Sequence, residues 1–230
     1  MLTLSLLFIV ALVSGYVDAI AGGGGLLTVP ALMLVNLPLT TAFGTNKGQA
    51  VFGVASSLYR YARSPLLDRR RAVVSFAAGF AGSVIGTVAV IYLGSRFEPY
   101  LRPVVMVLLA SVALVMLFQR LPDHVEAGRH RTWALVLLVA ASLGFYDGFF
   151  GPGTGMFLIM AYAWLWREAL DRASANAKVV NCASNLGSML TFLARGLIVW
   201  HYAIPMAAGQ LIGGWLGAHT VVTGGRKVVR

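Results

Sequence analysis

Asp18 and Asp147 each interrupt a long apolar run, and each is followed by a cluster of glycines. The first copy reads GYVDAIAGGG over residues 15–24, and the second reads GFYDGFFGPG over residues 144–153. An ionisable side chain inside a membrane-spanning run costs at least ~2.5 kcal/mol on insertion scales, so each aspartate is a candidate functional residue. The chemistry that we expect is ion or proton coupling, in which the carboxylate loads and releases a proton. The alternative is a helix cap that accepts backbone N–H bonds, and the two roles are compatible.

The glycine clusters predict two broken helices. Glycine permits positive φ and a close approach of backbones. The helix that follows each break directs unpaired N–H groups and its positive dipole end back toward the break, which favours an anion. Paired breaks of this kind form the substrate site of many secondary transporters, whereas close packing of small residues is the alternative explanation. The glycines expected to bind substrate are Gly23, Gly24, Gly25, Gly151 and Gly153.

A lysine follows each break and opens another apolar run. Lys47 comes after Thr45 and Asn46, and Lys178 comes shortly after Asn176. Lysine would supply a fixed positive charge, and the asparagine amides would supply hydrogen-bond donors for an oxyanion. The alternative is that both lysines extend to lipid headgroups from the ends of their spans.

Polar residues continue along one face of the helix predicted after Lys178. Asn181 and Asn185 recur at helical spacing, together with Cys182 and Ser188. A polar face on a membrane helix indicates a water-filled cavity. Cys182 is more typical of a small core side chain than of a reactive thiol. The residues expected to bind substrate, besides the glycines, are Thr45, Asn46, Lys47, Asn176, Lys178, Asn181 and Asn185.

Composition places these residues in a membrane protein. The chain has 230 residues, of which 58% are hydrophobic and 11% are charged, whereas soluble domains carry about 25% charged residues. The net charge of +10 resides in short loops between apolar runs, which indicates membrane topology and contact with lipid headgroups rather than nucleic acid. No residue pattern indicates a metal site, a cofactor or an enzyme's nucleophile with its base.

Nine apolar segments predict an all-α membrane protein. Two segments are shorter than the ~20 residues that cross hydrocarbon, and because each follows a glycine cluster we expect broken or re-entrant helices there. The nine segments cover residues 2–18, 24–36, 46–60, 72–94, 103–118, 132–148, 153–166, 178–194 and 202–222.

The basic residues orient the chain and relate its two halves. With the N-terminus outside, the loops at 60–71, 119–131 and 166–178 and the tail hold fourteen of the 18 lysines and arginines, so these segments and the C-terminus are cytoplasmic. Equivalent loops of the halves carry opposite charge character, which predicts two inverted four-helix repeats over 1–100 and 132–230, with a connecting helix and loop at 101–131. The second half lacks a counterpart of segment 103–118, and the residues leave open whether a final helix is missing.

The paired motifs together resemble the sulfite exporter TauE/SafE family. The resemblance rests on residues 15–30 and 44–47 in the first half, and on 144–153, 173–178 and Ser184-Asn185 in the second. It covers nearly the whole chain. It implies an inner-membrane permease for sulfite, thiosulfate or an organosulfonate, and the single cysteine argues against a relay of several thiols in this chain.

The expected function is therefore secondary transport of a small sulfur-containing anion, coupled to protons or another ion. A passive anion channel is the alternative. The expected partners are the anion and membrane lipids. The sequence is compatible with a homo-oligomer, and nucleic acid is not an expected partner. Which anion is carried, and in which direction, cannot be read from the residues.

Overall fold

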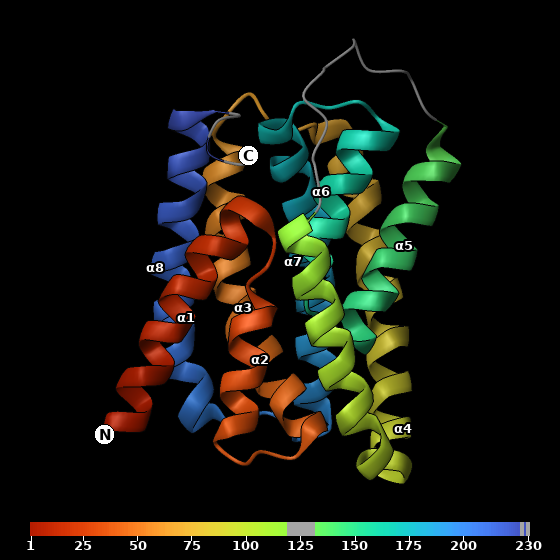
Figure 1. Ribbon diagram of the computed structural model, residues 1–230. Helices are drawn as coiled ribbons and strands as arrows, with labels where there is room; N and C mark the ends of the chain where they lie inside the picture. Colours follow the sequence, from red (N-terminus) through yellow and green to blue (C-terminus); the bar gives the residue numbers. More distant parts are fainter. Residues whose placement is uncertain (119–131, 226–227, 229–230) are drawn as a thin grey trace.

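The computed structural model describes residues 1–118, 132–225 and 228, and this part of the chain is a bundle of helices without strands (Figure 1). The helices are α1 (Leu2–Ala21), α2 (Gly25–Leu34), α3 (Leu39–Ala62), α4 (Arg69–Phe118), α5 (Trp133–Phe149), α6 (Thr154–Leu165), α7 (Leu170–Ala194) and α8 (Trp200–Gly224).

Each predicted apolar segment contains a helix, and some segments extend a residue or two beyond it. α4 contains two of them, because its backbone leaves helical geometry at Phe97 (φ −130°, ψ 22°) and the chain reverses there. The short helices after the glycine clusters, α2 with 10 residues and α6 with 12, are as expected. The loop predicted at 119–131 and most of the basic tail lie outside the described residues.

The prediction that Lys47 and Lys178 open their helices is wrong. α3 begins at Leu39 and α7 begins at Leu170, so each lysine lies about two turns inside its helix. Their exposed fractions are 4% and 1%. Neither side chain extends to lipid headgroups in this structure, because both are enclosed by neighbouring helices.

The outer surface of the bundle is apolar, as in a protein surrounded by lipid. Large hydrophobic side chains such as Leu34, Val73 and Phe118 are more than 70% exposed, whereas soluble monomers rarely expose extended apolar patches. Two stretches, Leu2–Ala21 and Arg69–Gly94, are long and apolar enough to cross a membrane on their own composition. α3, α7 and α8 are of similar length, and α3 and α7 are more polar because they line the interior.

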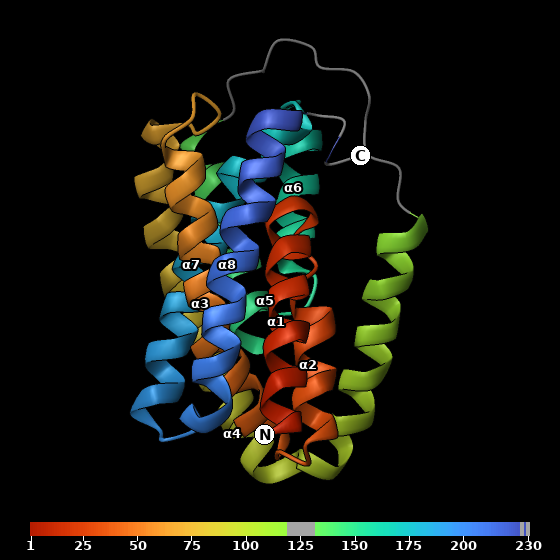
Figure 2. The same ribbon diagram turned by 90° about the vertical axis from the view of Figure 1, so that its left-hand side faces the viewer.

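The two halves of the chain interlock instead of forming separate bodies. α1 packs along α8 (Figure 2), and α5 packs along α4 (Figure 1), so a helix from each half lies against the other half. In Figure 1, α1 and α3 run upward and α2 runs downward, whereas α5 and α7 run downward and α6 runs upward. The halves therefore traverse the bundle in opposite directions.

Glycines allow these helices to approach closely. A Cβ atom at Gly213 of α8 would lie 2.0 Å from the carbonyl oxygen of Leu12, and one at Gly148 of α5 would lie 2.1 Å from that of Ser83. Helices associate in lipid largely through close packing of small residues, because apolar side chains gain little by exchanging lipid tails for protein neighbours.

Two apolar clusters fill the interior, one toward each end of the bundle. The first joins the start of α3 with the end of α7 and contains Leu39, Phe43 and Phe192. The second joins the opposite ends and contains Tyr61 and Leu170. The buried polar residues of α3 and α7 lie between these clusters, so each cluster separates them from one side of the membrane.

Candidate functional site

The buried polar residues surround a small cavity between the two apolar clusters. Its volume is about 30 Å³, which is the space of one or two water molecules. Every helix except α4 contributes to its wall. The lining residues are Asp18, Gly22, Gly24, Gly25, Thr28, Asn46, Lys47, Ala50, Val54, Asp147, Gly151, Gly153, Gly155, Asn181, Asn185 and Gln210.

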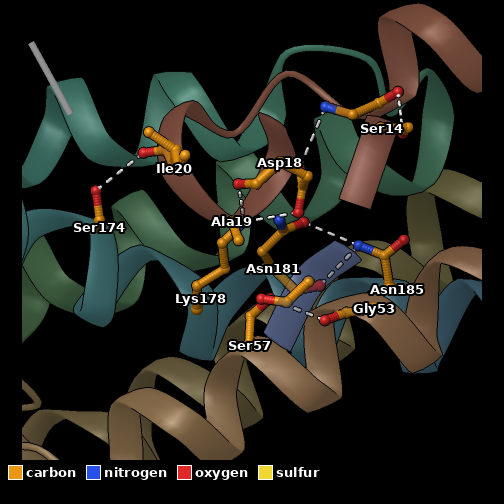
Figure 3. Close-up of polar contacts among 12 residues, drawn as sticks. Ser14, Asp18, Ala19, Ile20, Gly53, Ser57, Ser174, Lys178, Asn181 and Asn185 are labelled. Atoms are coloured by element: carbon orange, nitrogen blue, oxygen red, sulfur yellow. Dashed lines mark hydrogen bonds and ion pairs between the residues drawn. The ribbon is translucent and has the colours of Figure 1, made fainter. Parts of the chain in front are cut away.

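Each aspartate forms an ion pair with the lysine of the other half. Lys178 Nζ on α7 lies 2.6 Å from Asp18 Oδ2 on α1 (Figure 3). Lys47 Nζ on α3 lies 2.8 Å from Asp147 Oδ1 on α5. Breaking a buried pair by removing one partner costs about 3–5 kcal/mol, because an uncompensated charge remains. The two pairs therefore hold the halves together as well as placing charge in the cavity.

Capping is a minor role of these aspartates. Asp18 Oδ1 accepts a long hydrogen bond of 3.4 Å from the backbone N–H of Gly24. Asp147 accepts bonds from side chains, namely Ser184 Oγ at 2.6 Å and Asn185 Nδ2 at 3.3 Å. Neither α2 nor α6 has a side-chain cap at its first residue.

The two glycine breaks lie against each other at the centre of the bundle. A Cβ atom at Gly22 would lie 2.1 Å from the carbonyl carbon of Gly155, and Gly22 also has a φ of 76°. Gly22 and Gly155 thus serve close packing. Of the glycines expected to bind substrate, Gly24, Gly25, Gly151 and Gly153 line the cavity, whereas Gly23 is buried outside its wall.

Two asparagine amides present free donors to the cavity. Asn46 Oδ1 accepts hydrogen bonds from Thr28 Oγ1 at 2.6 Å and from Gln49 Nε2 at 3.0 Å. Asn181 Oδ1 accepts one from Asn185 Nδ2 at 2.8 Å. These bonds fix the amide orientations, because an oxygen must face each donor. The Nδ2 groups of Asn46 and Asn181 have no partner among the residues that the structure describes.

The second break adds backbone donors beside Lys47. A Cβ atom at Gly151 would lie 3.3 Å from Lys47 Nζ, so the ammonium group lies directly against this break. α6 begins just beyond it, at Thr154. Within the described residues, no hydrogen bond satisfies the N–H groups of Gly153 and Gly155. Lysine charge, helix dipole and free N–H groups thus converge on one side of the cavity.

Thr45 and Asn176, both predicted to bind substrate, lie outside the cavity wall. Thr45 Oγ1 accepts a hydrogen bond of 3.0 Å from the N–H of Val199, just before α8. Asn176 Oδ1 accepts one of 2.8 Å from the N–H of Asp68, just before α4. Thr45 thus links the loop before α8 to α3, the helix that carries Lys47. Asn176 likewise links the loop before α4 to α7, the helix that carries Lys178.

The loop at Asp68 is also held by charge. Asp68 pairs with Arg71 at 2.6 Å, and Arg71 also contacts Glu168, whose carboxylate accepts a bond from Asn176 Nδ2 at 2.7 Å. Burial alone would raise the pKa of Asp68, but hydrogen bonds from Arg71 and Arg70 outweigh it and lower that pKa below its ordinary value. Among the described residues, the side chains around Thr45 are mostly apolar and form no such ionic cluster.

We expect Thr45→Val to destabilise the protein by about 1 kcal/mol, because it removes the acceptor for the Val199 N–H and preserves side-chain volume. Thermal unfolding in detergent measures the change. Thr191→Val is the matched control, since Thr191 Oγ1 only bonds a carbonyl of its own helix. Equal melting temperatures for the two variants would contradict the role of Thr45.

Sequence patterns missed three polar residues of the site. Thr28 on α2 and Gln210 on α8 line the cavity, and Gln210 Nε2 also donates to Ser14 Oγ at 3.0 Å. Ser184, which the sequence analysis named only in the Ser184-Asn185 motif and not as a binding residue, donates a hydrogen bond to Asp147 Oδ2. Gln210 carries no sequence signal, because its helix is apolar around it. Cys182 is buried and does not line the cavity. No cluster of three metal-binding His, Cys, Asp or Glu side chains occurs in the described part of the chain.

Comparison with known proteins agrees with this architecture. Residues 7–230 match the family described as Sulfite exporter TauE/SafE. The chain belongs to this family. TauE/SafE relatives include a probable membrane transporter protein of Haemophilus influenzae, with 39% identity over 99% of this chain and 88% of the relative. Others are the probable membrane transporter proteins YfcA of Escherichia coli, with 35% identity over 100% of this chain and 84% of the relative, and ORF9 of Sinorhizobium, with 32% identity over 99% and 86%.

Membership of the TauE/SafE family makes this chain a membrane transporter protein and confirms the resemblance seen in its motifs. No solved structure matches the chain significantly.

Proposed function

We propose that this protein is a secondary transporter of a small sulfur-containing anion such as sulfite, thiosulfate or an organosulfonate. The observation that carries the proposal is the convergence of Lys47 with free donors of Asn46, Asn181 and the second glycine break. Only an anion with several acceptor oxygens makes use of so many donors at once. The family's description as a sulfite exporter directs the proposal to sulfur oxyanions.

We propose further that the two halves form inverted repeats around the site. Three observations support this: the opposite directions of the halves, the exchanged pairing of α1 with α8 and α5 with α4, and the crossed ion pairs. Inverted repeats give a carrier two similar conformations that open to opposite sides. The charge distribution of the loops supports an inner-membrane protein with its C-terminus in the cytoplasm.

A binding measurement tests the substrate class. Purified protein is heated with sulfite, thiosulfate, sulfoacetate, taurine, sulfate or acetate, each at two pH values. A ligand of the folded state at ~100 times its Kd stabilises the protein by roughly 2.7 kcal/mol. A rise in melting temperature with one or more of the sulfur-containing ligands but not with acetate supports the proposal, and a rise with acetate alone would contradict it.

We expect Asp147→Asn to abolish uptake driven by a pH gradient while leaving anion exchange intact. The amide cannot carry a proton, but it occupies the same space beside Ser184 and Asn185. Liposomes with and without a pH gradient separate the two activities. Unchanged gradient-driven uptake would show that Asp147 is not the coupling residue, and flux that does not saturate in either protein would indicate a passive channel.

A further inference from the structure

The two site lysines occupy equivalent sequence positions but have different surroundings. Lys178 Nζ donates both to Asp18 Oδ2 and to the backbone carbonyl oxygen of Asp18, and Lys178 does not line the cavity. Lys47 lines the cavity, and its Nζ has one partner among the described residues, Asp147. Of the three donors of an ammonium group, Lys47 thus retains two that can reach a ligand.

The contacts of Lys178 are those of a structural lock. Asp18 lies in the last turn of α1, which ends at Ala21, and its carbonyl oxygen also accepts the N–H of Gly22. A lysine at this position satisfies a terminal carbonyl and the negative end of the helix dipole. Lys178 therefore fixes the first break to α7.

The contacts of Asp147 resemble those of a bound anion. Its carboxylate forms an ion pair with Lys47 on α3 and accepts hydrogen bonds from Ser184 Oγ and Asn185 Nδ2 on α7. It also lies in the last turn of α5, where the helix dipole disfavours negative charge. Its position therefore depends on these three donors. An oxyanion could use the same donors.

A bound oxyanion needs more space than the cavity offers, so a group that lines the cavity must move away when the anion binds. A volume of about 30 Å³ holds one or two water molecules, and an ion with three or more oxygens needs more space. The Asp147 carboxylate stands between Lys47 and Ser184, and because Lys47 is the lysine that lines the cavity, the departure of Asp147 frees a cationic donor there.

We propose that the substrate anion binds to Lys47, and not to Lys178, by displacing the Asp147 carboxylate, which acts as an internal competitor. This inference rests on the proposed function and identifies the lysine that binds the transported anion. The Asp18–Lys178 pair stays closed during binding and holds the first break in place.

Two double variants test the assignment without leaving an unpaired buried charge. Lys47→Gln/Asp147→Asn removes the proposed site, and Lys178→Gln/Asp18→Asn removes the lock. Binding of sulfite, thiosulfate, sulfoacetate, sulfate and acetate is measured by titration calorimetry on folded protein in detergent. The first variant is expected to bind none of these anions. The second replaces one residue of the cavity wall, Asp18, but none of the proposed donors, so it is expected to melt at a lower temperature than the wild type and to bind with a Kd no more than about threefold higher.

The single variant Asp147→Asn tests competition directly. If the carboxylate occupies the site more than nine-tenths of the time, its removal lowers the apparent Kd by at least about tenfold. A weaker or unchanged affinity in a folded Asp147→Asn protein would overturn the competition. Loss of binding in the Lys178 double variant, or its persistence in the Lys47 double variant, would overturn the choice of lysine.

These outcomes are distinct from a failure of the proposed function. If the wild type binds only acetate, the sulfur-anion function fails while the same variants still decide which lysine binds. If the wild type binds no anion of the panel, both proposals fail.

Discussion

Lys178→Ala is expected to lower the free energy of unfolding by about 3–5 kcal/mol, because it leaves the Asp18 carboxylate buried without its partner. The side chain of Lys178 is 1% exposed and that of Asp18 is 15% exposed, so water replaces the lost contact only in part. The variant also loses the hydrogen bond to the Asp18 carbonyl at the end of α1. Thermal unfolding in detergent, with the yield of monodisperse protein, measures the effect.

Arg195→Ala is the matched control, since Arg195 is an exposed cation just after the same helix. Its effect is expected to stay within about 0.5 kcal/mol, as for most surface substitutions. Lys178→Ala combined with Asp18→Asn should recover part of the lost stability by removing the orphaned charge. If Lys178→Ala melts like the control, the ion pair is not a structural lock.

Gly22→Ala is expected to destabilise the protein by about 2–5 kcal/mol. An alanine at φ 76° costs about 1–2 kcal/mol by itself. Its Cβ would also lie 2.1 Å from the backbone of Gly155, and separating packed backbones adds about 1–3 kcal/mol. The measured quantity is the melting temperature, followed by anion binding in any folded fraction.

Gly196→Ala separates the two causes. Gly196 has a similar φ of 66°, but a Cβ there meets nothing within 4 Å. In this control only the backbone conformation is unfavourable, so the expected destabilisation is about 1–2 kcal/mol. Equal losses in the two variants would mean that the contact between the breaks contributes little to stability.

Local patterns in the sequence were sufficient for the helices and the two breaks. Long apolar runs specify helices in lipid because every backbone group must find its partner within the chain. Glycine clusters specify breaks because other residues avoid positive φ, as Gly22, Gly151 and Gly153 adopt here. The helix starts at Leu39 and Leu170 were missed because the polar residues that follow them resemble loop sequence until a partner helix buries them.

By itself, the sequence determined that this chain is a helical membrane transporter with duplicated, glycine-broken motifs that carry one aspartate and one lysine each. Only the tertiary structure decided which aspartate meets which lysine. In the structure, Thr45, Asn176 and Lys178 lie outside the cavity wall, and Gln210 is part of it. The physical reason is that spacing along a helix fixes the face on which a side chain lies, whereas the packing of distant helices fixes what that face contacts.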